Sequence, residues 1–229
     1  MREWNVSGNP ATMDPDEIEA LRSAIIHRRS LGVARLSADA VPHHLIENVL
    51  EAADWAPSHG ETEPWRFTVY TGDSRRLLGA AFARAYRIEA EADGTFKQTT
   101  FESQEQRAWG APVWISLGMV PERRADGSLK MLLEDELMAA ACAIQNLHLM
   151  ASAQGLAGMW LSKGVMVHAE VAKFVGLTEP DSRLLGFFIL GWPNVPWPVG
   201  ERRPLTEKVR WADSDDAAKR QAGGKTEGS

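Results

Sequence analysis

The sequence has a single cysteine and no long run of basic residues. Cys142 can form neither an intrachain disulfide nor a metal site built from cysteines. The formal net charge of −6 argues against a nucleic-acid partner. The first residues, from Met1 to Asn5, lack the apolar core of a signal peptide, so we expect a cytoplasmic protein.

The sequence also lacks the signatures of several enzyme classes. No G-x-G-x-x-G motif follows a predicted strand, and neither a P-loop motif nor a G-x-S-x-G nucleophile elbow occurs. The neighbouring residues His43 and His44 diverge by about 100° on a helix, so they cannot share a metal ion. We therefore predict no metal site and no set of catalytic side chains.

Formal charge is absent from Leu137 to Ser162, a segment long enough to span a bilayer. The segment contains several amide and histidine side chains, however, and glycines interrupt its second half. We therefore expect no membrane span, but a helix over 132–154 that is buried on all sides, followed by a buried strand over 157–161. Such a helix usually lies in the centre of a domain or in a subunit interface. Cys142, inside this helix, is expected to be a packed thiol.

Hydrophobic spacing and turn residues predict the remaining elements. Helices are expected over 15–27, 42–55, 74–91 and 168–175, and strands over 66–71, 112–120 and 184–190. The last strand is the most hydrophobic and is expected to be central. The polar segment from Asp93 to Arg107 has no clear pattern, and a mobile flap is one interpretation. The irregular order of helices and strands indicates an α+β fold, with a mixed sheet between helices.

The predicted domain covers residues 15–211. A flexible extension over 1–14 precedes it. A tail over 212–229, which has no apolar residue larger than alanine, is expected to be disordered.

Four groups of residues could bind a ligand. Arg28-Arg29-Ser30 follows the first predicted helix, and arginine binds phosphate through two hydrogen bonds while serine adds one donor. Alternatively, the two arginines only complement the dipole at the end of that helix. His59 could equally be a solvated loop residue, and Trp160 a core tryptophan at the end of a strand. Arg202 and Arg203 could form a simple surface pair.

In their order and spacing, five motifs together resemble the nitroreductase family. They are Arg-Arg-Ser at 28–30, Ala-Pro-Ser-His at 56–59, Pro-Trp-Arg-Phe at 64–67, Ala-Gln-Gly-Leu-Ala-Gly-Met-Trp at 153–160 and Leu-Gly-Phe-Phe-Ile-Leu-Gly-Trp-Pro at 185–193. The resemblance extends from about Ile25 to Trp211. It is greatest to compact members that carry histidine, rather than asparagine, in the Ala-Pro-Ser loop.

The resemblance implies a mainly antiparallel sheet flanked by helices, in an FMN-binding homodimer whose long buried helix lies in the subunit interface. It implies hydride transfer from NADH or NADPH through FMN to a nitroaromatic, a quinone or a similar small acceptor. The flavin would carry out this chemistry, which would explain why no catalytic side chains are evident. Two alternatives stay open. One is a flavoenzyme of the same fold with other chemistry, such as reductive dehalogenation or flavin cleavage, and the other is a flavin-binding protein without catalysis.

The resemblance also implies which residues bind the cofactor. These are Arg28, Arg29, Ser30, Arg35, Trp55, His59, Trp160, Leu161, Ser162, Arg202 and Arg203, with Gln154 and Gly155 as candidates for the nicotinamide site. His59 would contact the flavin of the partner subunit. The sequence departs from the family at two positions. Leu31 to Ala34 intervene before Arg35, which either still reaches the flavin or loses that contact, and Trp55 stands where related sequences can carry arginine.

Overall fold

The structure, a computed structural model, describes residues 12–211. The predicted disordered tail and most of the predicted flexible start lie outside these residues. The chain divides into one unit that ends at Pro198 and a second, short unit that begins at Val199. All regular helices and strands described below belong to the first unit.

The helices are α1 (Pro15–His27), α2 (His43–Asp54), α3 (Arg75–Ala92), α4 (Gln98–Gln106), α5 (Leu133–Ala153) and α6 (Ala169–Phe174), and the strands are β1 (Trp65–Thr71), β2 (Val113–Met119), β3 (Ala157–Leu161) and β4 (Arg183–Gly191). Every helix and strand predicted from hydrophobic spacing forms, with each end within one residue of the expected position. The predicted α+β fold class is therefore confirmed.

The four strands form one antiparallel sheet in the order β1-β2-β4-β3. β4 lies between two neighbours and is buried over most of its length, which confirms the prediction of a central strand. β3 is an edge strand. Its outer side carries one isolated parallel bridge, between Gly158 and Ser30. The segment that follows α1 is thereby attached to the edge of the sheet.

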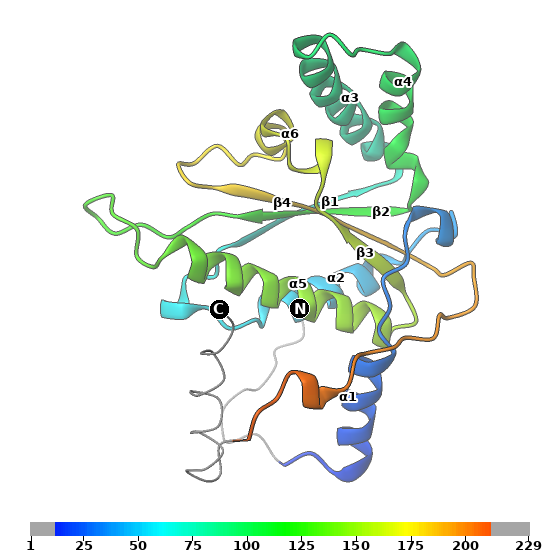
Figure 1. Ribbon diagram of the computed structural model, residues 1–229, viewed down its shortest axis with the longest axis vertical. Helices are drawn as coiled ribbons and strands as arrows, with labels where there is room; N and C mark the ends of the chain where they lie inside the picture. Colours follow the sequence, from blue (N-terminus) through cyan, green and yellow to red (C-terminus); the bar gives the residue numbers. More distant parts are fainter. Residues whose placement is uncertain (1–11, 212–229) are drawn as a thin grey trace, which may run out of the picture. The chain divides into compact units, whose positions relative to one another are not determined.

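Helices cover both faces of the sheet, with α2 and α5 on one face and α3, α4 and α6 on the other (Figure 1). Adjacent residues of β4 serve the two cores in turn, because successive side chains of a strand point to opposite faces. Phe187 packs edge-to-face on Phe82 of α3, with ring centroids 5.3 Å apart. Phe188 packs on the other side, with Val49 of α2 and Leu147 of α5.

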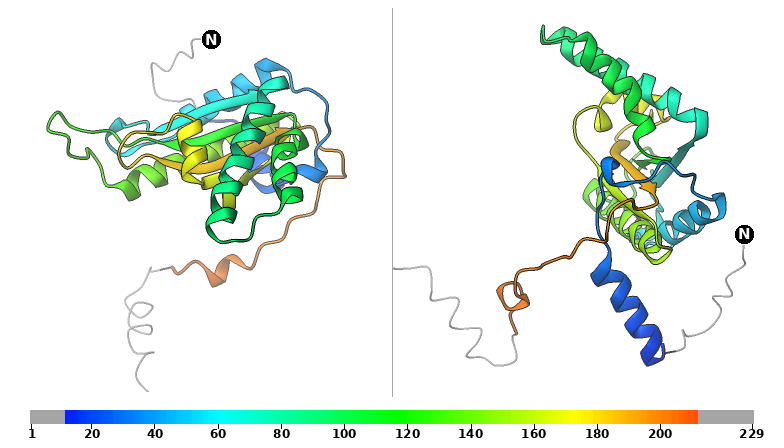
Figure 2. Two further views of the ribbon diagram at one scale, coloured as in Figure 1. Left: turned by 90° about the horizontal axis from the view of Figure 1, so that it is seen from above. Right: turned by 90° about the vertical axis from the view of Figure 1, so that its right-hand side faces the viewer.

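α1 forms at the predicted residues because its N-terminus is capped. Asp14 accepts hydrogen bonds from the first turn and Glu17 bonds back to the backbone of Asp14, which is a capping box. No residue of α1 is buried, however, and the helix extends away from the layered body (Figure 2). Ile18, Leu21 and Ile25 on this helix are each about half exposed, at 52%, 49% and 50%.

The prediction that the long helix is buried on all sides is wrong for the single chain. One face of α5 packs on the sheet through residues such as Ala143 and Leu147. The opposite face is exposed at Met138, which retains 59% of its accessible surface, and at Cys142. The expectation of a packed Cys142 thiol is therefore also wrong, because a helix lying across one face of a sheet buries only the side that faces the strands.

The polar segment after Asp93 is not an unpatterned flap, because it contains α4, which packs on α3. The guanidinium of Arg87 lies 4.2 Å from the ring centroid of Phe101. A side chain at Gly79 would place its Cβ 2.1 Å from the carbonyl oxygen of Glu105, so the two helices approach closely at this glycine. The hairpin of α3 and α4 is thus a packed unit.

Candidate functional site

The structure places Arg28-Arg29-Ser30 beside the edge strand β3. Ser30 forms the parallel bridge to Gly158, and the backbone N–H of Leu31 donates to the carbonyl oxygen of Gly158 over 3.0 Å. Gly158 is itself held tightly, because an added Cβ would lie 2.1 Å from the carbonyl oxygen of Ile189. The three-residue motif therefore lies at the start of the same strand that ends in the predicted residues Trp160, Leu161 and Ser162.

The two arginines of this motif have different surroundings. The Arg28 Nη1 atom lies 3.4 Å from the hydroxyl of Ser30 and 3.4 Å from Nδ1 of His148. Arg29 instead donates to three backbone carbonyls, those of Ile26 at 2.7 Å, Arg28 at 2.8 Å and Pro198 at 3.0 Å. Arg28 and Ser30 thus form a pair of donors that could hold an anion, whereas Arg29 mainly fixes the backbone.

His148 is buried next to this loop. Its Nε2 atom lies 3.1 Å from the carbonyl oxygen of Arg29, and its ring packs edge-to-face on Phe188 at 4.9 Å between centroids. Burial and, second, the positive charge of Arg28 lower the pKa of His148 to about 4, against the raising effect of hydrogen bonds to the backbone of Arg29 and Gly158. The imidazole is therefore neutral at neutral pH.

Trp160 is not a core residue, since 39% of its surface is exposed. Its indole N–H donates to the carbonyl oxygen of Leu185 over 2.7 Å, which fixes the ring at the edge of the sheet. Leu161 is half-buried and Ser162 is exposed. The backbone of Leu161 lies so close to Gly186 that a Cβ on this glycine would come within 2.0 Å of the Leu161 oxygen.

His59 lies away from this edge of the sheet, in a loop beside the first turn of α5. Its Nδ1 atom is 3.4 Å from the carboxylate of Asp135. The loop that carries His59 is anchored by the hydroxyl of Thr62, which donates over 2.6 Å to the buried carboxylate of Glu136. Trp55, at the end of α2, is 59% exposed.

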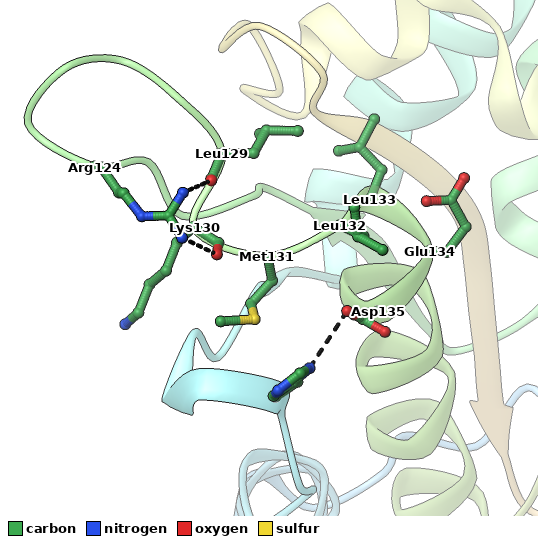
Figure 3. A pocket seen from close by; sticks show the side chains of 9 residues that line it. Arg124, Leu129, Lys130, Met131, Leu132, Leu133, Glu134 and Asp135 are labelled. Atoms are coloured by element: carbon green, nitrogen blue, oxygen red, sulfur yellow. Dashed lines mark hydrogen bonds and ion pairs between the residues drawn. The ribbon is translucent and has the colours of Figure 1, made fainter.

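An open pocket of about 540 Å³ adjoins the His59 loop (Figure 3). Its lining is formed by His59, Arg124, Leu129, Lys130, Met131, Leu132, Leu133, Glu134 and Asp135. The two basic side chains are engaged elsewhere: Arg124 donates to the carbonyls of Leu129 and Lys130, and the Lys130 ammonium lies 2.8 Å from Glu122. The lining of the pocket is therefore mostly apolar, with the contact between His59 and Asp135 at one side.

One chain does not bring His59 and Arg28 together. His59 contacts Asp135 in the first turn of α5, and Arg28 contacts His148 near the opposite end. Thirteen residues separate these two positions, which corresponds to about 20 Å along a helix. His59 and Arg28 therefore lie in two separate places on each chain, at the two ends of the same helix.

Five other predicted residues have the following surroundings. Arg35 is exposed in a short 3-10 turn, and its carbonyl accepts a hydrogen bond of 3.1 Å from the backbone of Asn194. The amide of Gln154 bonds to Asn48 and to the carbonyl of Leu45, and Gly155 ends α5 with a φ of +76°. Arg202 and Arg203 belong to the second unit. Cofactor or nicotinamide contacts of these residues stay predictions.

Sequence reasoning missed Asp135 and His148. His148 does carry a signal, because it falls at helical spacing with Ile144 and Ala151 on the buried face of α5, where a polar side chain needs a partner. Among residues 12–211, no cluster of side chains could hold a metal ion. In the same part of the chain, no helix has the length and hydrophobicity to cross a bilayer.

Comparison with known proteins identifies the class of this fold and site. A sequence profile of the nitroreductase family matches residues 25–192, so the chain belongs to the nitroreductase family. YdjA of Escherichia coli (strain K12), provisionally named an NAD(P)H nitroreductase, is 28% identical over 171 residues, which cover 75% of this chain and 87% of YdjA.

Two solved structures are similar over most of the chain. A nitroreductase-like family protein from Bacillus cereus is 26% identical with a TM-score of 0.67, and the match covers 85% of this chain and 96% of that protein. The FMN-dependent nitroreductase NfnB from Mycobacterium smegmatis, solved in complex with NADPH, is 21% identical with a TM-score of 0.63, over 86% and 100% of the two chains. At that identity, the match to NfnB shows the fold alone.

Proposed function

We propose that this chain is an FMN enzyme that passes a hydride from NADH or NADPH to a nitroaromatic, a quinone or a similar small acceptor, and that it works as a homodimer. As a member of the nitroreductase family it is an NAD(P)H-dependent flavin oxidoreductase. The observation that carries the finer proposal is the pair formed by Arg28 and Ser30 at the edge of β3.

This pair fits a terminal phosphate. The guanidinium of Arg28 and the hydroxyl of Ser30 lie within 3.4 Å of each other, so one phosphate group could accept hydrogen bonds from both. The half-buried guanidinium of Arg28 contacts the neutral imidazole of His148, which adds no negative charge that would compete with the phosphate. A single phosphate and the lack of a dinucleotide fingerprint favour FMN over FAD.

The end of β3 is where we place the residues for the flavin ring. Trp160, Leu161 and Ser162 follow Gly158 along an edge strand, which offers exposed backbone groups and one hydroxyl within about 13 Å of the phosphate pair. Bound FMN would accept a hydride from the nicotinamide and deliver it to the acceptor. The protein's residues bind and orient the reactants.

The homodimer follows from the two groups of site residues on each chain. Because His59 lies about 20 Å along α5 from the position of Arg28, we infer that His59 of a second copy completes the site. The uncharged outer face of α5, with Met138 and Cys142 exposed, and the exposed apolar side chains of α1 supply an interface. A second copy of this chain can cover both.

The absorption spectrum of the purified protein tests the proposal. We expect a flavin spectrum, release of FMN identified by mass analysis, and bleaching by NADH or NADPH under anaerobic conditions. Recovery of the oxidised spectrum on adding a quinone or nitroaromatic would identify the acceptor class. FAD as the released cofactor, or no flavin uptake after reconstitution, would contradict the cofactor assignment, and a flavin that neither nucleotide bleaches would contradict the reaction.

A further inference from the structure

His148 occupies a position that packing alone does not explain. It is the one histidine among residues 12–211 that is buried, with 7% of its surface exposed. Its neighbours on the same helix face are apolar, and Phe188 of β4 packs against its ring. An apolar side chain would fill this space without the cost of burying two ring nitrogens. The two ring nitrogens therefore need hydrogen-bond partners, and those partners identify the segment that His148 contacts.

Each ring nitrogen has a partner in the Arg28-Arg29-Ser30 segment, and the backbone of Gly158 also forms a hydrogen bond with the imidazole. The partner of Nε2 is the carbonyl oxygen of Arg29, 3.1 Å away, and because a carbonyl can only accept, the Nε2 atom carries the proton. The Nδ1 atom of this neutral tautomer is then an acceptor, and it lies 3.4 Å from the Nη1 donor of Arg28. One imidazole thus contacts the backbone of one arginine and the guanidinium of the other.

The helix before this segment, α1, contributes few contacts that could fix it. α1 buries none of its residues, so it does not hold the segment firmly. Contacts that fix the backbone of the segment include the bridge of Ser30 to Gly158, the bond of the Trp197 indole to the carbonyl of His27 and the bonds of Arg29 to backbone carbonyls. His148 contacts the guanidinium of Arg28 itself.

We propose that His148 is a positioning residue for the anion site: it holds the guanidinium of Arg28 beside the hydroxyl of Ser30, ready for the FMN phosphate. This inference rests on the proposed function. His148 does not itself touch the cofactor, and it acts through Arg28. A neutral imidazole suits this role, because a protonated one would lose the Nδ1 acceptor and repel the arginine.

The test is the FMN affinity of the reconstituted apoprotein in a double-mutant cycle. His148→Leu keeps the packing but removes both hydrogen bonds, and we expect it to weaken FMN binding about tenfold. His148→Gln can still donate to the Arg29 carbonyl and accept from Arg28, so it should recover most of that loss. If His148 acts through Arg28, then His148→Leu combined with Arg28→Ala should bind FMN no more weakly than Arg28→Ala alone.

Leu147→Ala is the matched control, because Leu147 is a fully buried neighbour on α5 whose apolar side chain forms no hydrogen bond. It should lower the melting temperature of the apoprotein while its effect on FMN affinity adds to that of Arg28→Ala. A purely structural role for His148 would give the same additive result, which would overturn the inference.

A second measurement needs no variant of His148 and no cofactor. The pKa of His148, followed by NMR in the apoprotein, should rise in Arg28→Ala because a neighbouring positive charge is removed. An unchanged titration would show that the two side chains do not interact. If the wild-type protein takes up no FMN, the proposed function itself fails together with the inference. If the wild type binds FMN while His148→Leu binds it equally well, only the inference fails.

Discussion

His59 and Arg28 contact the same helix at its two ends. Asp135, in the first turn of α5, holds the imidazole of His59, and His148, more than three turns later, holds the guanidinium of Arg28. In the proposed homodimer, a site that uses both side chains takes them from two chains. Assembly and cofactor affinity should consequently be linked in this protein.

Met138→Glu should weaken both the dimer and FMN binding. Met138 is exposed on the outer face of α5, and a carboxylate placed in an apolar interface must be desolvated on association. Light scattering at micromolar concentration should show a dimer for the wild type and a shift toward monomer for the variant. Leu77→Glu on α3 is the matched control, because Leu77 is similarly exposed on the opposite side of the sheet. A monomeric wild type that still binds FMN would contradict the two-chain site.

Arg28→Ala should weaken FMN binding about ten- to a hundredfold. A hydrogen bond to a charged group contributes about 1.5–3 kcal/mol, and this range corresponds to that change in affinity. Ser30→Ala should have a smaller effect, since it removes one neutral donor. Equilibrium titration of the apoprotein with FMN measures both, and Arg76→Ala, which removes an exposed arginine of α3, serves as the control. If a folded Arg28→Ala protein bound FMN with wild-type affinity, the two arginines would only complement the dipole at the end of α1.

Most helices and strands could be predicted from the sequence because each carries a local signal. Asp14 and Glu17 cap α1, and the continuous hydrophobic run of β4 indicates a strand that is buried on both faces. α4 carries no such signal: apart from Phe101 it is polar, and its position depends on contacts with α3. An element that is stabilised mainly by a neighbour cannot be recognised from its own residues.

The site was predictable only in part, for a similar reason. Arg28 and Ser30 stand in a motif, and the motif identifies them. Asp135 and His148 act through residues more than 70 positions away, and a single sequence does not reveal such pairs. The uncharged stretch around Cys142 is compatible with a core helix and with an interface helix, because both exclude charge. Only the exposed outer face of α5 distinguishes the two in the single chain.

Arg35→Gln should keep most of the bound FMN but lower its midpoint potential. The residues before Arg35 do not loop out freely, because Leu31 is fully buried, so the turn that carries Arg35 is fixed to the body. A fixed cation near the flavin ring favours the more negatively charged reduced cofactor. For a two-electron couple about 30 mV corresponds to about 1.4 kcal/mol, so a shift of tens of millivolts is expected in a spectroscopic redox titration. Arg35→Lys keeps the charge and should retain the potential. A potential that is equal in all three proteins would show that Arg35 does not reach the ring.

Protein stability should fall as the pH drops from about 6.5 to about 4, and His148 should account for part of that fall. The ordinary pKa of histidine is about 6.5, whereas burial lowers that of His148 to about 4 in the folded chain. Below pH 6.5 the unfolded chain binds a proton at this position that the folded chain does not bind. The stabilisation from a neutral His148 is therefore complete above pH 6.5 and is lost as the pH falls through the folded pKa.

The shift corresponds to roughly 3 kcal/mol between the two pH limits. Urea unfolding of the apoprotein at a series of pH values between 7.5 and 4 measures it, with His148→Gln as the variant that has no proton to bind. The difference in the free energy of unfolding between wild type and variant should change by that amount, in favour of the variant at low pH. His44→Gln removes an exposed histidine of α2 and is the control for the loss of any imidazole. Parallel pH profiles for the wild type and His148→Gln would mean that His148 is protonated alike in the folded and unfolded chains, and its neutral contact with Arg28 would then have no basis.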